Sequence, residues 1–167
     1  MADFKINITG HKAIIDQINH LPSKLQRKSA TQAARRAMIP VRDRARADAR
    51  AFDDEKSPEK VWKNIVIQNS ASRGKRIGGV VMRVGVRGGS RRYAATKRNV
   101  REGKAGKKYK TQGDKSNPGG DTWYWRFLEF GTKRMSAQAF LLPALMNQAQ
   151  SVWNNLFNEM QKVLEKK

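Results

Sequence analysis

Residues 88–120 contain almost no side chain that can enter a hydrophobic core, and this limits the fold more than any other feature. Gly, Lys, Arg, Ser, Asn and Thr dominate the segment, which has only three larger apolar or aromatic residues, Tyr93, Val100 and Tyr109. A stretch of this length without core residues is typical of a functional or disordered loop. The sequence therefore predicts a single domain over residues 1–167, with 88–120 as a basic, flexible loop.

Much of the positive charge lies in this loop and in one predicted helix. The chain has 35 Lys and Arg against 14 Asp and Glu, a net charge of +21. Residues 88–120 hold ten Lys and Arg against two acidic residues, and residues 24–50 hold nine against two. Such a charge favours an anionic partner, which would be nucleic acid, an anionic membrane or an acidic protein. No apolar run approaches the ~20 residues of a membrane helix, so we expect a soluble protein made in a cytoplasm, with no membrane partner.

Three segments are predicted to be strands, and alternation of side chains between two faces supports the first and the last of them. They are residues 4–9, 61–68 and 80–86. The last two flank a connector with a basic stretch and Gly78-Gly79, so we expect them to form a β-hairpin. The predicted fold class is α+β, in which this small antiparallel sheet packs with a long N-terminal helix and a C-terminal helix.

Helical spacing of apolar residues predicts these two main helices. The first restarts at Ser23, after a short helix that Pro22 ends, and it carries a narrow stripe of alanines. Pro40 should bend it, because proline removes a backbone donor. The last helix has Pro143 in its first turn. Its predicted apolar stripe consists of Leu142, Leu145, Ala149, Val152, Leu156, Met160 and Val163.

The densest apolar segment, residues 123–130, reads Trp-Tyr-Trp-Arg-Phe-Leu-Glu-Phe. It fits a buried strand or a short helix, and Gly131 directly after it favours a helix with a left-handed C-cap. Its aromatic side chains are either core residues or, because one small core does not need them all, part of a subunit interface beside a charged rim.

Catalysis has little support in the sequence. The only histidines, His11 and His20, form no ligand pair, and no cysteine is present as a nucleophile or thiolate ligand. The only acidic cluster is residues 53–55, for which a solvated loop is a simpler interpretation than a metal site. No glycine-rich phosphate-binding pattern occurs. We therefore expect a protein that is not an enzyme and that has no metal and no cofactor.

Residues 123–135 and 137–145 resemble the signature of a tail-completion, or neck, protein family of long-tailed double-stranded DNA phages. That signature reads roughly Tyr-x-x-Phe-x-Glu-Phe-Gly-Thr and, after a short spacer, Ala-x-Pro-Phe-Leu-x-Pro-Ala. This chain departs from it at Ala139, where the family usually has Pro. The motif residues that we single out as interface or structural residues are Trp123, Tyr124, Trp125, Phe127, Glu129, Phe130, Gly131, Thr132, Phe140 and Pro143.

We expect structural roles for these motif residues. Gly131 lets the chain turn without a Cβ penalty. Phe140 can fill the core at the point where the last helix starts. Glu129 is either a buried partner of an arginine or a capping group.

The resemblance implies a structural virion protein that completes the head-proximal end of the tail and helps head–tail joining. It implies a homo-oligomeric ring, expected to be hexameric, next to the tail terminator and the head-closure protein, in a virion that assembles in the host cytoplasm. DNA in the lumen would be a further, non-specific partner. Its candidate contacts are Arg91, Arg92, Lys97, Arg98, Arg101, Lys104, Lys107, Lys108 and Lys110. The alternative is a non-specific nucleic-acid-binding protein of the ribosome- or nucleoid-associated kind.

Overall fold

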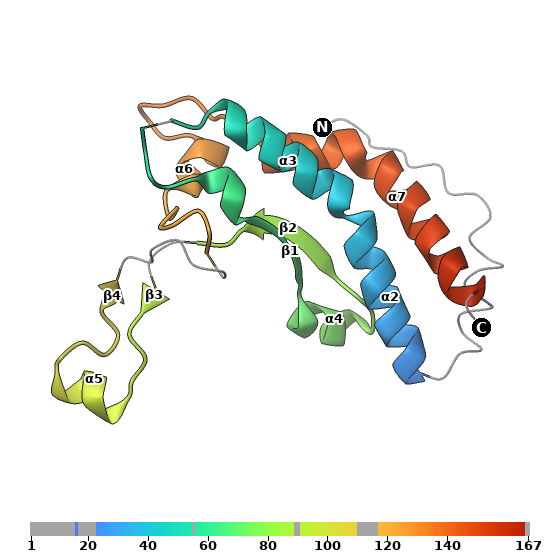
Figure 1. Cartoon of the computed structure of the whole chain (residues 1–167), viewed down its shortest axis with the longest axis horizontal. Coiled ribbons are helices and arrows are strands. Elements are labelled where there is room, and N and C mark those ends of the chain that lie inside the picture. The colour runs from blue at the N-terminus through green and yellow to red at the C-terminus, as the bar shows by residue number, and fades with distance from the viewer. Residues whose placement is uncertain (1–15, 17–22, 55, 89–90, 110–116, 166–167) are drawn as a thin grey trace. The chain divides into compact units, whose positions relative to one another are not determined.

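The computed structural model in Figure 1 confirms the predicted α+β class. It describes residues 16, 23–54, 56–88, 91–109 and 117–165. The predicted strand over 4–9, the apolar positions of the short first helix and both histidines lie outside these residues.

The chain divides into two compact units that alternate along the sequence. Unit 1 takes in the chain up to Arg44, residues 67–85 and the chain from Leu142 onward, and unit 2 takes in residues 45–66 and 86–141. The aromatic motif and the basic segment both belong to unit 2.

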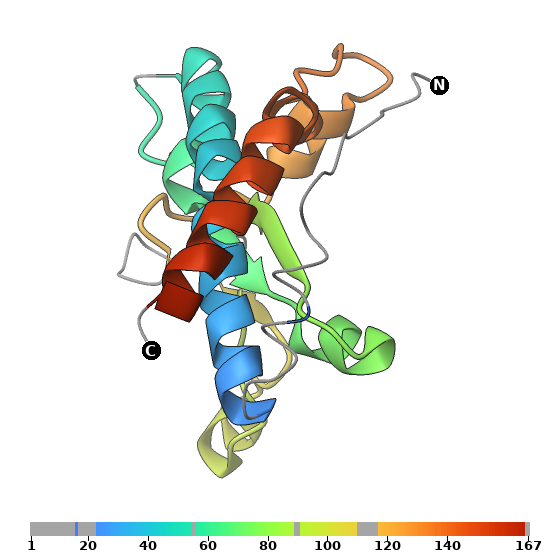
Figure 2. The same ribbon diagram turned by 90° about the vertical axis from the view of Figure 1, so that its right-hand side faces the viewer.

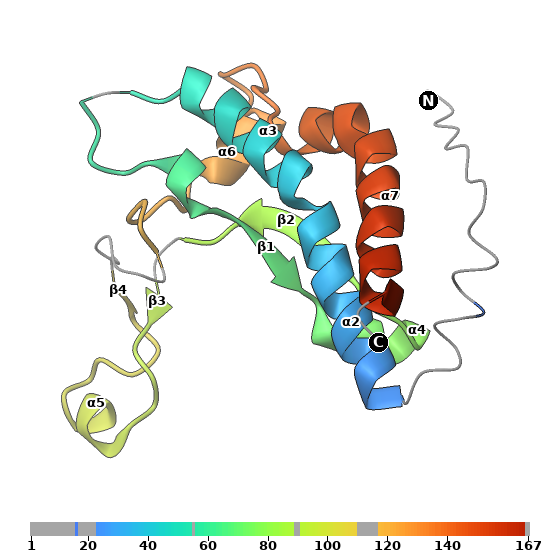
Figure 3. The same cartoon turned by 45° about the vertical axis from the view of Figure 1, so that its right-hand side comes forward.

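The Ala-rich segment forms two successive helices, α2 (Ser23–Ala37) and α3 (Ile39–Ala51) (Figure 3). They meet at Met38, as expected from Pro40, which has no N–H to continue the helical ladder. The predicted alanine stripe is confirmed as a buried face. Its buried members, spaced four residues apart, are Ala33, Ala37, Val41, Ala45 and Ala49.

The predicted hairpin is present as the two-stranded sheet of β1 (Ile65–Asn69) and β2 (Met82–Val86), which lie side by side in Figures 1 and 3. Its connector contains a short helix, α4 (Ala71–Ile77), which the sequence did not predict. This helix ends at Gly78, whose φ of 67° lies in the left-handed region that favours glycine.

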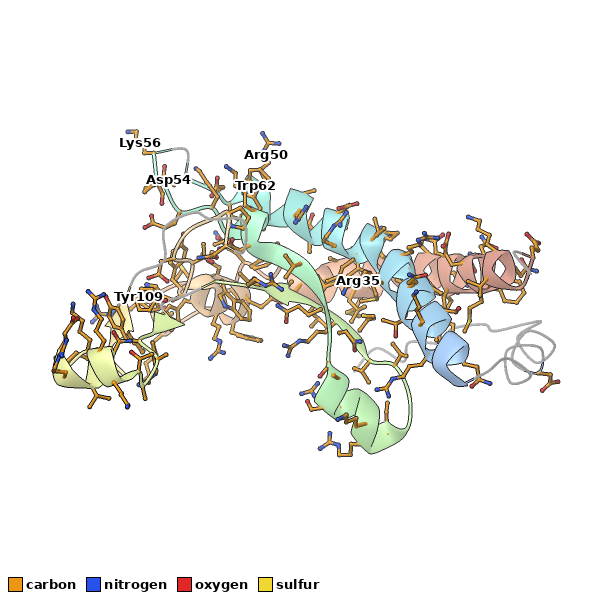
Figure 4. The ribbon with its side chains drawn as sticks, turned by 60° about the horizontal axis from the view of Figure 1, so that its bottom comes forward. Arg35, Arg50, Asp54, Lys56, Trp62 and Tyr109 are labelled. Carbon is orange, nitrogen blue, oxygen red and sulfur yellow. The ribbon has the colours of Figure 1, made fainter. Side chains whose placement is uncertain are left out.

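The prediction of one strand over 61–68 is wrong in its first half. Residues Val61–Asn64 form a 3₁₀ helix, η1, and only the following residues are extended. Trp62 of η1 lies next to Arg50 of α3, whose guanidinium carbon is 5.4 Å from the ring centroid (Figure 4). This cation–π contact belongs to unit 2 and joins two successive elements of the chain.

The last helix, α7 (Leu141–Glu165), is drawn in red in Figure 2. Pro143 lies in its first turn, as predicted. Its apolar stripe is buried only in part. Ala149 is buried, but Leu142 and Leu145 are exposed, which corrects the prediction for the start of the stripe.

Glu159 joins α7 to α2 within unit 1. Its carboxylate accepts hydrogen bonds from Arg36 of α2, at 2.6 Å, and from Lys162, at 3.0 Å. These two cations hold the pKa of the Glu159 carboxyl below its usual value.

Residues 91–109 form a second hairpin, which corrects the prediction of a segment without regular structure. Strand β3 (Arg91–Arg92) pairs antiparallel with β4 (Lys108–Tyr109). Helix α5 (Lys97–Arg101) lies between them at the end of the hairpin (Figure 1).

Candidate interface on helix α6

The aromatic segment forms the short helix α6 (Trp125–Phe130), which confirms the helical alternative. Gly131 ends it by donating its N–H to the carbonyl of Phe127, at 2.9 Å. Its φ of 72° is positive as predicted, but its ψ of −176° is not left-handed helical, and this combination is open essentially only to glycine. A Cβ at this position would lie 2.8 Å from Ala137 N and 2.9 Å from Met135 O. Both backbone conformation and space therefore require glycine here.

Three aromatic side chains of this segment are exposed to solvent. The exposed fraction is 57% for Trp123, 46% for Phe127 and 75% for Phe130. Phe127 and Phe130 are three residues apart in α6 and therefore lie on one side of it, and Trp123 lies in the turn directly before the helix. The rings of Trp123 and Phe127 meet edge to face, with centroids 5.6 Å apart. We call these three residues the aromatic surface, and the core interpretation does not hold for them.

The other two aromatic residues of the segment are half-buried supports. Burial raises the pKa of the Tyr124 phenol, and the carboxylates of Glu59 and Asp53 raise it further. Trp125 lies beside Arg126, whose guanidinium carbon is 5.6 Å from the ring centroid. Tyr124 thus lies close to the acidic loop before η1, within unit 2.

Glu129 is buried, although it lies between exposed residues of a surface helix. Its Oε2 accepts hydrogen bonds from the backbone N–H groups of Phe140, at 2.9 Å, and Leu141, at 3.0 Å. These N–H groups lie at the start of α7, where a helix has donors without partners and a partial positive charge. The structure thus confirms the capping alternative for Glu129.

The loop after α6 turns back tightly onto α6 before α7 begins. The backbones of Thr132 and Met135 form an isolated antiparallel bridge, and the N–H of Gln138 donates to the carbonyl of Leu128 at 2.8 Å. At its end Phe140 is fully buried, as predicted. The motif residues therefore build a compact support on which the aromatic surface sits.

A buried polar network that the sequence patterns did not predict fixes the segment before α6. The side chain of Asn64 in η1 donates to Gly120 O at 3.0 Å and to Thr122 Oγ1 at 2.8 Å, and it accepts from Gly119 N at 2.7 Å. The sequence of residues 117–120, Asn-Pro-Gly-Gly, is typical of a turn. Asn64, however, fell inside a predicted strand, so no pattern linked it to a turn more than fifty residues later.

All predicted nucleic-acid contacts except Lys110 lie in the hairpin of residues 91–109. The exposed cations there are Arg92, Lys97, Arg98, Arg101, Lys104, Lys107 and Lys108. Two of them pair with the single acid of the hairpin, Glu102. Lys110 and the side chain of Arg91 lie outside what the structure describes.

The acidic residues before η1 form an ordinary ion-paired loop. Asp53 accepts from Lys60 Nζ at 2.9 Å, and the same ammonium donates to the carbonyl of Asp54. In the described part of the chain, no group of three or more His, Cys, Asp or Glu residues could hold a metal ion. None of the helices described is both long enough and apolar enough to cross a membrane.

Comparison of the chain with family models, curated proteins and solved structures gave no match. The resemblance to phage neck proteins therefore stays a prediction from the sequence. What the site provides chemically is an apolar surface on a support fixed by buried hydrogen bonds.

Proposed function

We propose that this chain is a structural protein of the neck of a long-tailed double-stranded DNA phage. It would form a ring at the head-proximal end of the tail and help to join the tail to a filled head, without catalysing a reaction. The observation that carries the proposal is the aromatic surface, held outward by a helix whose buried face is anchored through Glu129. The residues that resemble the phage motif are those that build this support.

The composition around the aromatic surface suits a protein–protein contact. Aromatic side chains dominate the energetics of interfaces, each burying about 150–250 Å², and contiguous exposed apolar patches mark interaction sites. Arg126, Lys133 and Arg134 are exposed nearby in the sequence. They would supply the polar rim that usually surrounds an interface core.

A ring also needs a second, different face, because each copy contacts two neighbours through non-identical surfaces. Unit 1 exposes a separate set of apolar residues along α7. They are Leu142, Leu145, Met146 and Trp153. We propose that the aromatic surface of one copy packs on this α7 surface of the next copy.

The phage assignment is tested in particles. We expect the chain in purified virions, and electron microscopy of tails carrying a tagged chain should show density for the tag at the head-proximal end only. Virions that lack the chain would contradict the proposal, and so would density spread along the tail tube.

A further inference from the structure

The hairpin of residues 91–109 has a defined backbone but contributes nothing to a hydrophobic core. It carries eight Lys and Arg against one acidic residue, Glu102. Apart from alanines, its apolar and aromatic residues are Tyr93, Tyr109 and Val100, and Val100 is exposed. The order of this segment therefore comes from its own hydrogen bonds and ring contacts.

Those contacts lie along the hairpin strands and in the turn between them. The rings of Tyr93 and Tyr109 stack with centroids 4.5 Å apart. Tyr93 N–H donates to Lys107 O, and Gly106 N–H donates to Tyr93 O, both at 3.0 Å. The hydroxyl of Thr96 caps α5. The hairpin thus holds its surface cations on a preorganised backbone, so binding costs less ordering entropy.

Of the eight cations of the hairpin, Arg92 donates to the carbonyl of Gly106 at 3.1 Å, and the side chain of Arg91 lies outside what the structure describes. The other six form two groups. In the first, Lys104 and Arg98 are bound to Glu102, at 2.9 and 2.8 Å, and they hold the pKa of its carboxyl below the usual value. The second group is exposed, and its charged ends have no hydrogen-bond or ion-pair partner among the described residues. Its members are Lys97, Arg101, Lys107 and Lys108.

We propose that this hairpin binds the phosphate backbone of a nucleic-acid duplex through these four unpaired cations. Phosphate binding needs donors and positive charge but no apolar anchor, and it is driven by the release of condensed counterions. The core of a protein–protein interface, by contrast, is depleted in lysine and rich in aromatic anchors. The two tyrosines stack on each other, so we assign them to the stability of the hairpin. Binding is therefore independent of base sequence.

This inference does not rest on the proposed ring, because it is tested on the purified full-length chain. Binding to a fluorescent duplex of about 30 base pairs is measured by anisotropy over a series of salt concentrations. The variant Lys97→Gln/Arg101→Gln/Lys107→Gln/Lys108→Gln is compared with Arg27→Gln/Lys28→Gln/Lys75→Gln/Arg76→Gln. The control removes the same charge from exposed positions outside the hairpin.

For the hairpin variant we expect the negative slope of log K against log salt concentration to become shallower by about 3–4, close to 0.9 per lost phosphate contact. The control variant should change the slope by less than about 1. Equal slopes for the two variants would overturn the proposal, because the charge of the whole chain would then bind without a defined site. No binding by the wild-type chain at low salt would overturn it as well.

Two further measurements distinguish phosphate binding at the hairpin from binding of an acidic protein there. Replacing Lys97, Lys107 and Lys108 with Arg keeps the charge and should preserve wild-type duplex binding. If this variant loses duplex binding as the quadruple Gln variant does, the proposal is overturned. The quadruple hairpin variant should also bind anionic poly-glutamate about as well as the control variant does. If the quadruple hairpin variant binds poly-glutamate more weakly than the control variant but binds the duplex unchanged, the partner is an acidic protein and the proposal is overturned.

Discussion

At residue 129 a buried carboxylate fixes the direction in which α6 faces. Glu129 points inward because two backbone N–H groups at the start of α7 need an acceptor. The aromatic residues on the other side of the same helix are consequently exposed. This reverses the usual arrangement, in which an amphipathic helix buries its aromatic side chains and exposes its acids.

Replacing the carboxylate tests this role. In Glu129→Gln the formal charge is lost while the shape is kept, so the hydrogen bonds to Phe140 and Leu141 weaken. We expect the free energy of unfolding to fall by about 1–3 kcal/mol, measured by urea denaturation. Glu165→Gln, at an exposed position near the end of α7, is the matched control and should have wild-type stability. Equal stability of the two variants would contradict the capping role.

The requirement for glycine at residue 131 leads to a second prediction at this scale. A Cβ there meets backbone atoms of Met135 and Ala137, and the φ of 72° is unfavourable for any other residue. Gly131→Ala should lower the free energy of unfolding by at least about 2 kcal/mol. Gly85→Ala is the control, because a Cβ at Gly85 would meet no atom within 4 Å. We expect its urea midpoint to stay close to that of the wild-type chain, and a similar loss in both variants would count against a special requirement for glycine at residue 131.

At the scale of elements, the sequence predicts what depends on local periodicity. The stripe of alanines, the start of α7 and the helical nature of α6 follow from spacing, from Pro143 and from the glycine after the aromatic run. The hairpin of residues 91–109 could not be found in this way, because its strands are two residues long and it has no apolar periodicity. Likewise, the strand prediction failed at η1, because Asn64 binds a distant turn and not the sheet, and no local pattern shows this.

The contact between α2 and α7 makes stability depend on pH. The pKa of Glu159 is lowered in the folded chain by Arg36 and Lys162, so the unfolded chain binds its proton first as pH falls. The stabilisation is fully present above the usual pKa of the carboxyl and is lost as pH falls through the lowered value. From about pH 6 to about pH 3, the urea midpoint of the wild-type chain should therefore fall more than that of Glu159→Gln. Parallel curves would show that this ion pair adds nothing to stability.

At the scale of the whole molecule, the sequence identified the residues of the site but not their orientation. The motif could be recognised from Glu129-Phe130-Gly131-Thr132 and Phe140, and the structure gives these residues supporting roles. Whether the aromatic side chains lie inside or outside depended on a hydrogen bond between segments that periodicity does not connect. The net charge of +21 indicated an anionic partner, and only the hairpin geometry shows which of its described cations are left unpaired.

The central claim is that the aromatic surface joins copies of this chain, and native mass spectrometry of the purified protein tests it most directly. We expect the wild-type chain to form closed rings, with six copies as the expected number. Phe127→Ser/Phe130→Ser should be monomeric with an undiminished free energy of unfolding, because both side chains are exposed in the single chain. Ile77→Ser, which changes an exposed apolar residue on α4, should still form rings. Rings of the double variant as abundant as those of the wild-type chain, or a wild-type chain that stays monomeric, would contradict the claim.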